Sequence, residues 1–126
     1  AYVEPRGIGS FLQRLKKIGL RYAVTGSAAA AAVAPIAPTR LVICYVDDPE
    51  KAAGRLDLRR SETGANVMLA EPFDPVVFDR TWTKDGIRYA AYSQIAADLL
   101  TSPGRGPAEG EEFLRWMKEN ERAWRA

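Results

Sequence analysis

The spacing of apolar residues along the chain predicts a regular alternation of helices and strands. Apolar side chains recur at helical spacing in residues 10–18, with Ser10 as a candidate N-cap and Gly19 as the stop. Residues 40–46 are β-branched and aromatic with apolar side chains on both faces, which is typical of a central strand. On these patterns we expect helices at 10–18, 27–33, 49–56, 94–100 and about 107–124, and strands at 21–25, 40–46, 66–70 and 87–90.

Proline, glycine and capping residues set the expected boundaries. Pro35 ends the alanine-rich helix, and Asp48 before Pro49 starts the next one. Two prolines limit residues 71–80 to an edge or a loop, residues 84–86 form a turn, and Ser93 is a candidate cap. The order of elements predicts one α+β domain over 1–126, with a small mixed central sheet flanked by helices and a helix pair at the C-terminal end.

Composition narrows the chemistry that this domain can perform. The chain has 126 residues, 47% of them hydrophobic and 27% charged, which is ordinary for one folded domain. It contains no histidine and one cysteine, Cys44, so histidine-based catalysis, a disulfide framework and a thiolate metal site are excluded. No apolar run reaches the roughly 20 residues of a membrane span, and no signal peptide is evident, so we expect a cytoplasmic location. Because the chain opens without methionine, we expect it to be a fragment of a longer protein.

Basic residues gather near the N-terminus, although the net charge is only +2. Any contact with DNA or a partner would begin there. Arg105, in a Gly-Arg-Gly turn, is a further candidate for an anion or partner contact; the favoured alternative pairs it with Asp98 or Glu109 to fix the turn. The candidate contact residues are Arg6, Arg14, Lys16, Lys17 and Arg105.

Gly26 and Ser27 raise the main functional question, because a strand that ends in Gly-Ser and opens a helix exposes unpaired N–H groups to an anion. They are therefore candidates for phosphate or nucleotide binding. The structural alternative, which we favour, is that Gly26 makes a tight turn and Ser27 caps a helix packed closely on the sheet.

The segment "VTGS" resembles the opening of the polymerase-β-type nucleotidyltransferases, whose Gly-Ser contacts a triphosphate. That resemblance implies that the next strand carries two carboxylates, separated by one residue, that bind Mg²⁺. Residues 40–46 contain none, and Asp47 and Asp48 follow as neighbours that would point to opposite faces. We interpret them as a turn and a helix start, with a metal site as the alternative, so the scaffold resembles a degenerate nucleotidyltransferase.

A longer resemblance covers nearly all of the chain from Leu20 onward. The stretches "LRYAVTGSAAAAAVAPIAPTRLVICYVDDPEKA", "GANVMLAEPFDPVVFD" and "DGIRYAAYSQIAADLLTSPGRGPAEGEEFLRWM" resemble the C-terminal domain of actinobacterial AbiEi-type antitoxins of type IV toxin–antitoxin systems. The resemblance implies a transcriptional regulator that binds DNA through a winged helix-turn-helix upstream of this chain. It also implies a nucleotidyltransferase-like toxin as the opponent, usually without stable contact, and no cofactor.

Three functions remain open on the sequence. The leading hypothesis is a non-catalytic regulatory or interaction domain, with homodimer formation as a further mode of action. The second is a Mg²⁺-dependent nucleotidyltransferase that uses Gly26, Ser27, Asp47 and Asp48, and it requires these acids to converge near Ser27. The third is a nucleotide sensor that binds an anion at Gly26 and Ser27 without turnover.

Overall fold

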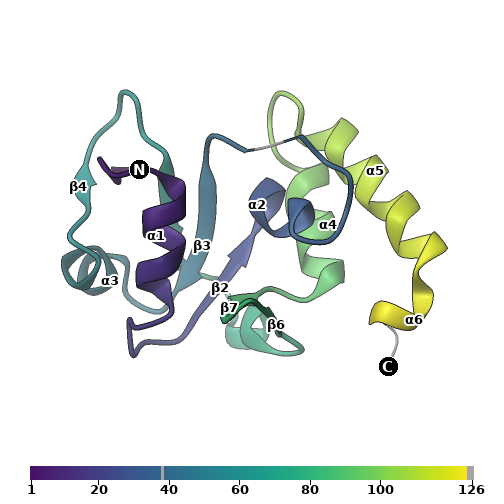
Figure 1. Ribbon diagram of the computed structural model, residues 1–126, viewed down its shortest axis with the longest axis horizontal. Coiled ribbons are helices and arrows are strands. Elements are labelled where there is room, and N and C mark those ends of the chain that lie inside the picture. The colour runs from purple at the N-terminus through teal and green to yellow at the C-terminus, as the bar shows by residue number, and fades with distance from the viewer. Residues whose placement is uncertain (38, 125–126) are drawn as a thin grey trace.

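The computed structural model describes residues 1–37 and 39–124 and confirms an α+β fold built on one seven-stranded mixed sheet (Figure 1). The β5–β3 and β2–β7 pairs are parallel, and the remaining pairs are antiparallel. In sheet order the strands are β4 (Arg59–Arg60), β1 (Tyr2–Val3), β5 (Val67–Ala70), β3 (Val42–Val46), β2 (Tyr22–Thr25), β7 (Ile87–Tyr89) and β6 (Trp82–Lys84).

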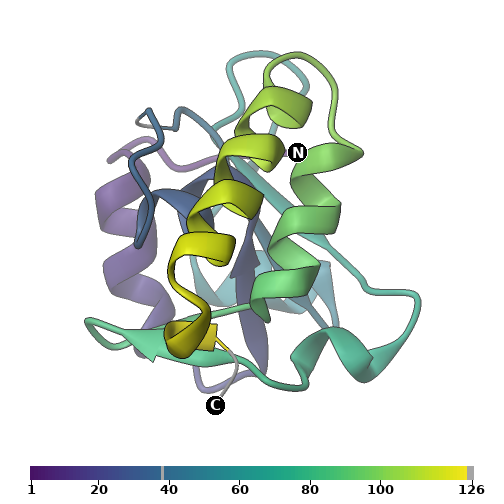
Figure 2. The ribbon, with the colours of Figure 1, turned by 90° about the vertical axis from the view of Figure 1, so that its right-hand side faces the viewer.

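Helices cover both faces of this sheet. The first group lies on one side and consists of α1 (Ile8–Leu15) and α3 (Pro49–Arg55). The second group lies on the other side and consists of α2 (Gly26–Ala31), α4 (Tyr92–Leu100), α5 (Gly106–Glu119) and the short α6 (Glu121–Trp124). Figure 2 shows α5 and α4 side by side in front of the sheet, so the C-terminal helix pair is present as predicted.

Strand β3 shows how the two faces are divided. Val42, Cys44 and Val46 are buried on one face, whereas the alternate residues Ile43 and Tyr45 are only partly buried. Tyr45 reaches α4, so its face is the one covered by the second helix group. This central strand is therefore covered from both sides, as the apolar pattern predicted.

Boundaries set by local chemistry are confirmed. The Asp48 side chain caps α3 by accepting a hydrogen bond from the Lys51 N–H at 3.2 Å, with Pro49 in the first turn. The β6–β7 hairpin turns at Asp85 and Gly86, whose φ angles of 53° and 81° suit a tight two-residue turn.

Several other boundary predictions are wrong. Ser10 and Ser93 lie inside their helices, which begin at Ile8 and Tyr92 after Gly7 and Ala91, and neither helix has a side-chain cap. The helix expected over 10–18 ends at Leu15. The helix expected over 27–33 covers Gly26–Ala31, and the one expected over about 107–124 breaks at Asn120 into α5 and α6. Tertiary packing decided these ends where the local signal was weak.

Four elements lie where no helix or strand was predicted. One is the hairpin strand β6, which includes Lys84 of the predicted turn. The two-residue strands β1 and β4 pair with each other and are too short to leave a periodic pattern. Residues 71–80, expected as an edge or a loop, contain a 3-10 helix, η1 (Pro75–Phe78), which Asp74 caps through the Val76 N–H at 2.9 Å.

Candidate functional site

The turn at Gly26 joins the central strand β2 to helix α2. Gly26 has a φ of 69°, a left-handed conformation that side-chain-bearing residues rarely adopt. A Cβ placed there would lie 3.5 Å from the Ile43 side chain, which is ordinary contact. The glycine is therefore required for backbone conformation rather than for space.

Ser27 does not cap α2 as predicted. Its hydroxyl donates a hydrogen bond of 2.6 Å to a carboxylate oxygen of Glu109, in the first turn of α5. Helix α2 spans only Gly26–Ala31 and has no side-chain cap. Ser27 therefore joins α2 to α5, two helices that are far apart in the sequence.

A second carboxylate lies beside the end of β2. Asp98 of α4 accepts hydrogen bonds from the Thr25 hydroxyl at 2.6 Å and the Tyr45 hydroxyl at 2.9 Å. Its other oxygen accepts from the Gln94 amide at 2.9 Å, one helical turn away. We call these residues and the Ser27–Glu109 pair the polar network; its members are Thr25, Ser27, Tyr45, Gln94, Asp98 and Glu109.

The network is buried enough to matter energetically. Thr25 is 1% exposed, and within the described part of the chain no buried side-chain nitrogen or oxygen lacks a hydrogen-bond partner. Burial, reinforced by the negative charge and the hydrogen bond of Asp98, raises the pKa of Tyr45 to about 12. The Tyr45 hydroxyl therefore keeps its proton at neutral pH and acts as a donor to Asp98.

The polar network is negatively charged, which is the opposite of what a phosphate-binding site requires. Its two carboxylates take up the hydroxyl donors that a phosphate oxygen would need, and they bring negative charge to the start of α2. Asp98 and Glu109 accept hydrogen bonds from the Thr25 and Ser27 hydroxyls, so two carboxylates of the protein itself lie beside this turn. The network can hold α4 and α5 on the sheet, but a phosphate would meet repulsion.

Asp47 and Asp48 do not converge on Ser27. In the antiparallel β2–β3 register Thr25 lies opposite Ile43 and Tyr22 opposite Val46. Ser27 therefore follows one end of the pair and Asp47 the other, which contradicts the convergence required by the nucleotidyltransferase alternative.

Both aspartates have structural partners instead. Two hydrogen bonds from Arg21, of 2.7 and 3.0 Å, lower the pKa of Asp47. Asp48 caps α3. No group of three potential ligands suited to a metal ion exists among residues 1–37 and 39–124.

The basic candidates do not form one surface. Arg6 pairs with the buried carboxylate of Glu4 at 3.0 Å, and Arg14 donates to the Leu56 carbonyl at 2.6 Å, so both stabilise the fold. Lys16 and Lys17 are exposed after α1. Arg105 comes directly before α5, which covers the other face of the sheet from α1 (Figure 1).

Arg105 is exposed, and the pairing expected for it is not found. Among the described residues no ion pair joins it to Asp98 or Glu109. Those two carboxylates accept hydrogen bonds from the polar network instead. The turn around Arg105 is therefore fixed by other contacts.

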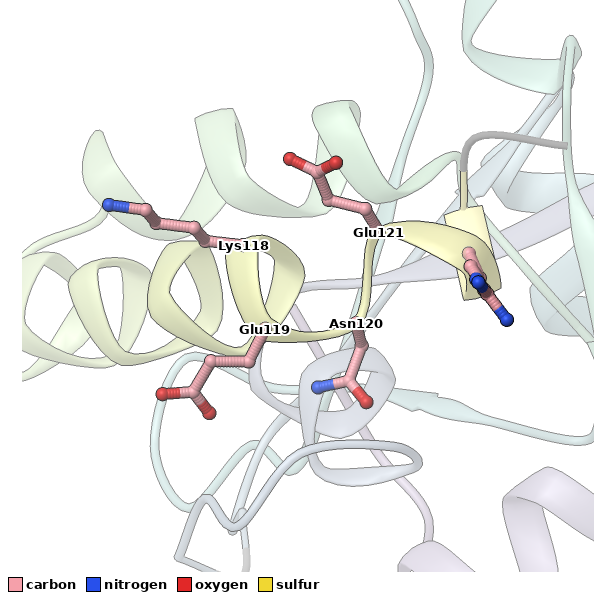
Figure 3. A pocket seen from close by; sticks show the side chains of 5 residues that line it. Lys118, Glu119, Asn120 and Glu121 are labelled. Atoms are coloured by element: carbon pink, nitrogen blue, oxygen red, sulfur yellow. The ribbon is translucent and has the colours of Figure 1, made fainter.

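A pocket of about 520 Å³ at the α5–α6 junction lacks the convergence of an active site. Figure 3 shows Lys118, Glu119, Asn120 and Glu121 pointing in different directions rather than toward a common centre. The Asn120 amide donates to the Trp116 carbonyl at 2.8 Å, which satisfies the helix end. This pocket is a shallow concavity beside a helix break.

The network residues Thr25, Tyr45 and Glu109 were not predicted as a site. The one sequence signal was the four-residue spacing of Gln94 and Asp98, which places them on one helical face.

Comparisons with protein-family models, curated proteins and solved structures found no match. The described helices include none with the length and apolar character needed to span a membrane.

Proposed function

We propose that this chain is a non-catalytic regulatory or interaction domain of an AbiEi-type, antitoxin-like transcriptional regulator. It would act in the cytoplasm together with a separate DNA-binding domain. The resemblance from Leu20 onward supports this biological setting. The observation that supports a non-catalytic role is the hydrogen bond from Ser27 to Glu109, which occupies the position where a nucleotide-binding relative would hold phosphate.

Electrostatic repulsion opposes any nucleotide that would displace the Ser27–Glu109 hydrogen bond. A nucleotide bound at Ser27 would have to break the Ser27–Glu109 bond and place its phosphates beside Asp98 as well. Two like unit charges about 4 Å apart repel by about 4 kcal/mol at the effective dielectric constant near a protein surface. Repulsion of this size from two carboxylates removes most of the affinity that a Gly-Ser turn provides.

A thermal-shift titration with ATP, GTP, CTP and UTP, each with and without Mg²⁺, tests the proposal. We expect no rise in melting temperature at millimolar nucleotide. A ligand at 100 times its Kd stabilises the native state by about 2.7 kcal/mol, which shifts the midpoint by several degrees. Such a shift, dependent on Mg²⁺ and lost in Ser27→Ala, would overturn the proposal.

The regulatory part is tested by DNA binding. The full-length protein encoded by the gene and this 126-residue domain are each titrated with the promoter DNA of that gene in a mobility-shift assay. We expect sequence-specific binding by the full-length protein and only weak, salt-sensitive binding by the domain. Specific binding by the domain alone would contradict a separate DNA-binding domain.

A further inference from the structure

A second pocket, between α5 and the segment that follows α2, has the composition of a docking site. Its volume is about 250 Å³, equal to roughly eight water molecules and enough for the end of one long side chain. None of the residues that line it belongs to the polar network. We call it the Trp116 groove; it is lined by Pro35, Glu112, Arg115, Trp116 and Glu119.

The aromatic wall of this groove is held in place from behind. Trp116 stacks on Tyr92 and Phe113 with ring centroids 5.7 Å apart in each case, and Tyr92 stacks on Trp82 at 4.7 Å. Phe113 is fully buried, so the stack is anchored in the core. The exposed part of the partly buried Trp116 indole is therefore a rigid surface that a ligand can contact with little loss of conformational entropy.

The rim of the groove is acidic and unpaired. Glu112, Trp116 and Glu119 are spaced by four and three residues, which places them on one stripe of α5. Neither glutamate forms an ion pair within the described part of the chain. Arg115 lines the groove but pairs with neither of them. Two free carboxylates beside an aromatic face complement a cation.

We infer that the Trp116 groove binds an arginine side chain presented by a basic segment of another protein. A guanidinium stacks on an indole and donates bidentate hydrogen bonds to carboxylates, which a lysine ammonium does less well. The composition of α5 agrees with this charge, because the helix contains four glutamates against one arginine and one lysine.

This inference deepens the proposed interaction function by naming the chemistry of a partner, and it rests on that function. Its test is independent of the nucleotide titration. If nucleotide raises the melting temperature and the arginine peptide still binds, only the non-catalytic role is overturned. If the arginine peptide does not bind and nucleotide leaves the melting temperature unchanged, only the groove assignment is overturned.

The probe is the peptide acetyl-Gly-Arg-Gly-Arg-Gly-amide, followed by NMR through the indole N–H signal of Trp116, assigned with Trp116→Phe. A matched peptide carries citrulline in place of both arginines and so removes the charge while keeping the shape. We expect a saturable shift of the Trp116 signal with the arginine peptide, and at least fivefold weaker binding of the citrulline peptide. Equal binding of the two peptides would overturn the inference.

Charge variants on the surface of α5 locate the site without threatening the fold. We expect Glu112→Gln/Glu119→Gln to weaken arginine-peptide binding about fivefold or more, because it removes both carboxylates. The control Glu62→Gln/Glu71→Gln makes the same change in net charge at exposed positions outside the groove. An equal loss in both double variants would show non-specific attraction and overturn the assignment.

Arg115 provides a test in the opposite direction. Because it is a cation on the same groove, it repels the incoming guanidinium, and we expect Arg115→Gln to strengthen peptide binding about threefold. Weaker binding by this variant would contradict the geometry.

Sedimentation of the wild-type protein completes the test. If the protein dimerises and Glu112→Gln/Glu119→Gln abolishes the dimer, the groove binds a second copy of this chain, and its assignment to another protein is overturned.

Discussion

Replacing Asp98 with alanine tests whether the polar network holds the C-terminal helices on the sheet. The Asp98 carboxylate accepts three side-chain hydrogen bonds, two from the sheet through Thr25 and Tyr45 and one from Gln94. Asp98→Ala removes the acceptor and leaves all three donors in place. The cost therefore depends on how well each donor can reach water.

The three donors differ in exposure, and this sets the magnitude. Thr25 is 1% exposed, so its orphaned hydroxyl should cost the full penalty for an unsatisfied buried group, about 1–3 kcal/mol. Tyr45 and Gln94 are partly exposed and can be hydrated at lower cost. We expect Asp98→Ala to reduce the free energy of unfolding by about 2–4 kcal/mol.

A double-mutant cycle separates this mechanism from simple loss of packing. Thr25→Val removes the buried hydroxyl while keeping the side-chain shape, and should cost about 1 kcal/mol by itself. In the Asp98→Ala background the same change removes the orphaned donor. The combined loss should therefore be smaller than the sum of the single losses by about 1 kcal/mol or more.

Urea unfolding of the four proteins, followed by far-UV circular dichroism, measures the cycle. Glu62→Ala serves as the control, since this exposed residue should change stability by less than about 0.5 kcal/mol. A loss below about 1 kcal/mol for Asp98→Ala, or additivity within about 0.3 kcal/mol, would refute the reasoning.

Three further predictions follow from the backbone and from Tyr45. Gly106→Ala should cost about 1–3 kcal/mol in urea unfolding because the new Cβ would lie 2.7 Å from the Leu99 carbonyl oxygen, whereas Gly54→Ala, with open space, should be neutral or stabilising. Gly26→Ala should cost about 1–2 kcal/mol from its φ of 69°; a loss above about 3 kcal/mol would show a contact that the structure lacks. Burial and Asp98 raise the pKa of Tyr45 to about 12, from about 10 in the unfolded chain, so the folded state retains this proton longer. Stability should therefore fall as pH rises from 10 to 12, and chemical denaturation across that range should show a shallower fall in Tyr45→Phe.

The fold could be predicted where local chemistry decides it. Asp48 and Pro49 start α3, and the Asp85–Gly86 turn forms the hairpin, because capping and turn conformations depend on adjacent residues. Ser10 and Ser93 were predicted as caps but lie three and two residues after the actual N-caps, Gly7 and Ala91, since a serine near a helix start resembles a cap whether or not its side chain is used. Strands of two residues, such as β1, exist only through their partners and leave no pattern of their own.

Only those residues of the candidate site that are neighbours in the sequence could be predicted. Gly26 and Ser27 could be recognised from a strand, a glycine and a helix in succession. Glu109 is 82 positions after Ser27, and Asp98 is 73 positions after Thr25, so no local pattern connects them. Whether a Gly-Ser turn meets a phosphate or a carboxylate depends on how later helices pack, which is a property of the whole fold.

The same dependence decides whether a strand–glycine–helix turn meets a ligand or another part of its own chain. The N–H groups and hydroxyls at the end of β2 favour an anion in any protein that has this turn. If the helices that pack there bring no carboxylate, the turn is free for a ligand. Here α4 and α5 bring Asp98 and Glu109, which accept hydrogen bonds from the Thr25 and Ser27 hydroxyls and stabilise the packing of those helices on the sheet. Helix α5 also carries the exposed Glu112 and Glu119 beside Trp116, and we expect this stripe to favour a cationic partner.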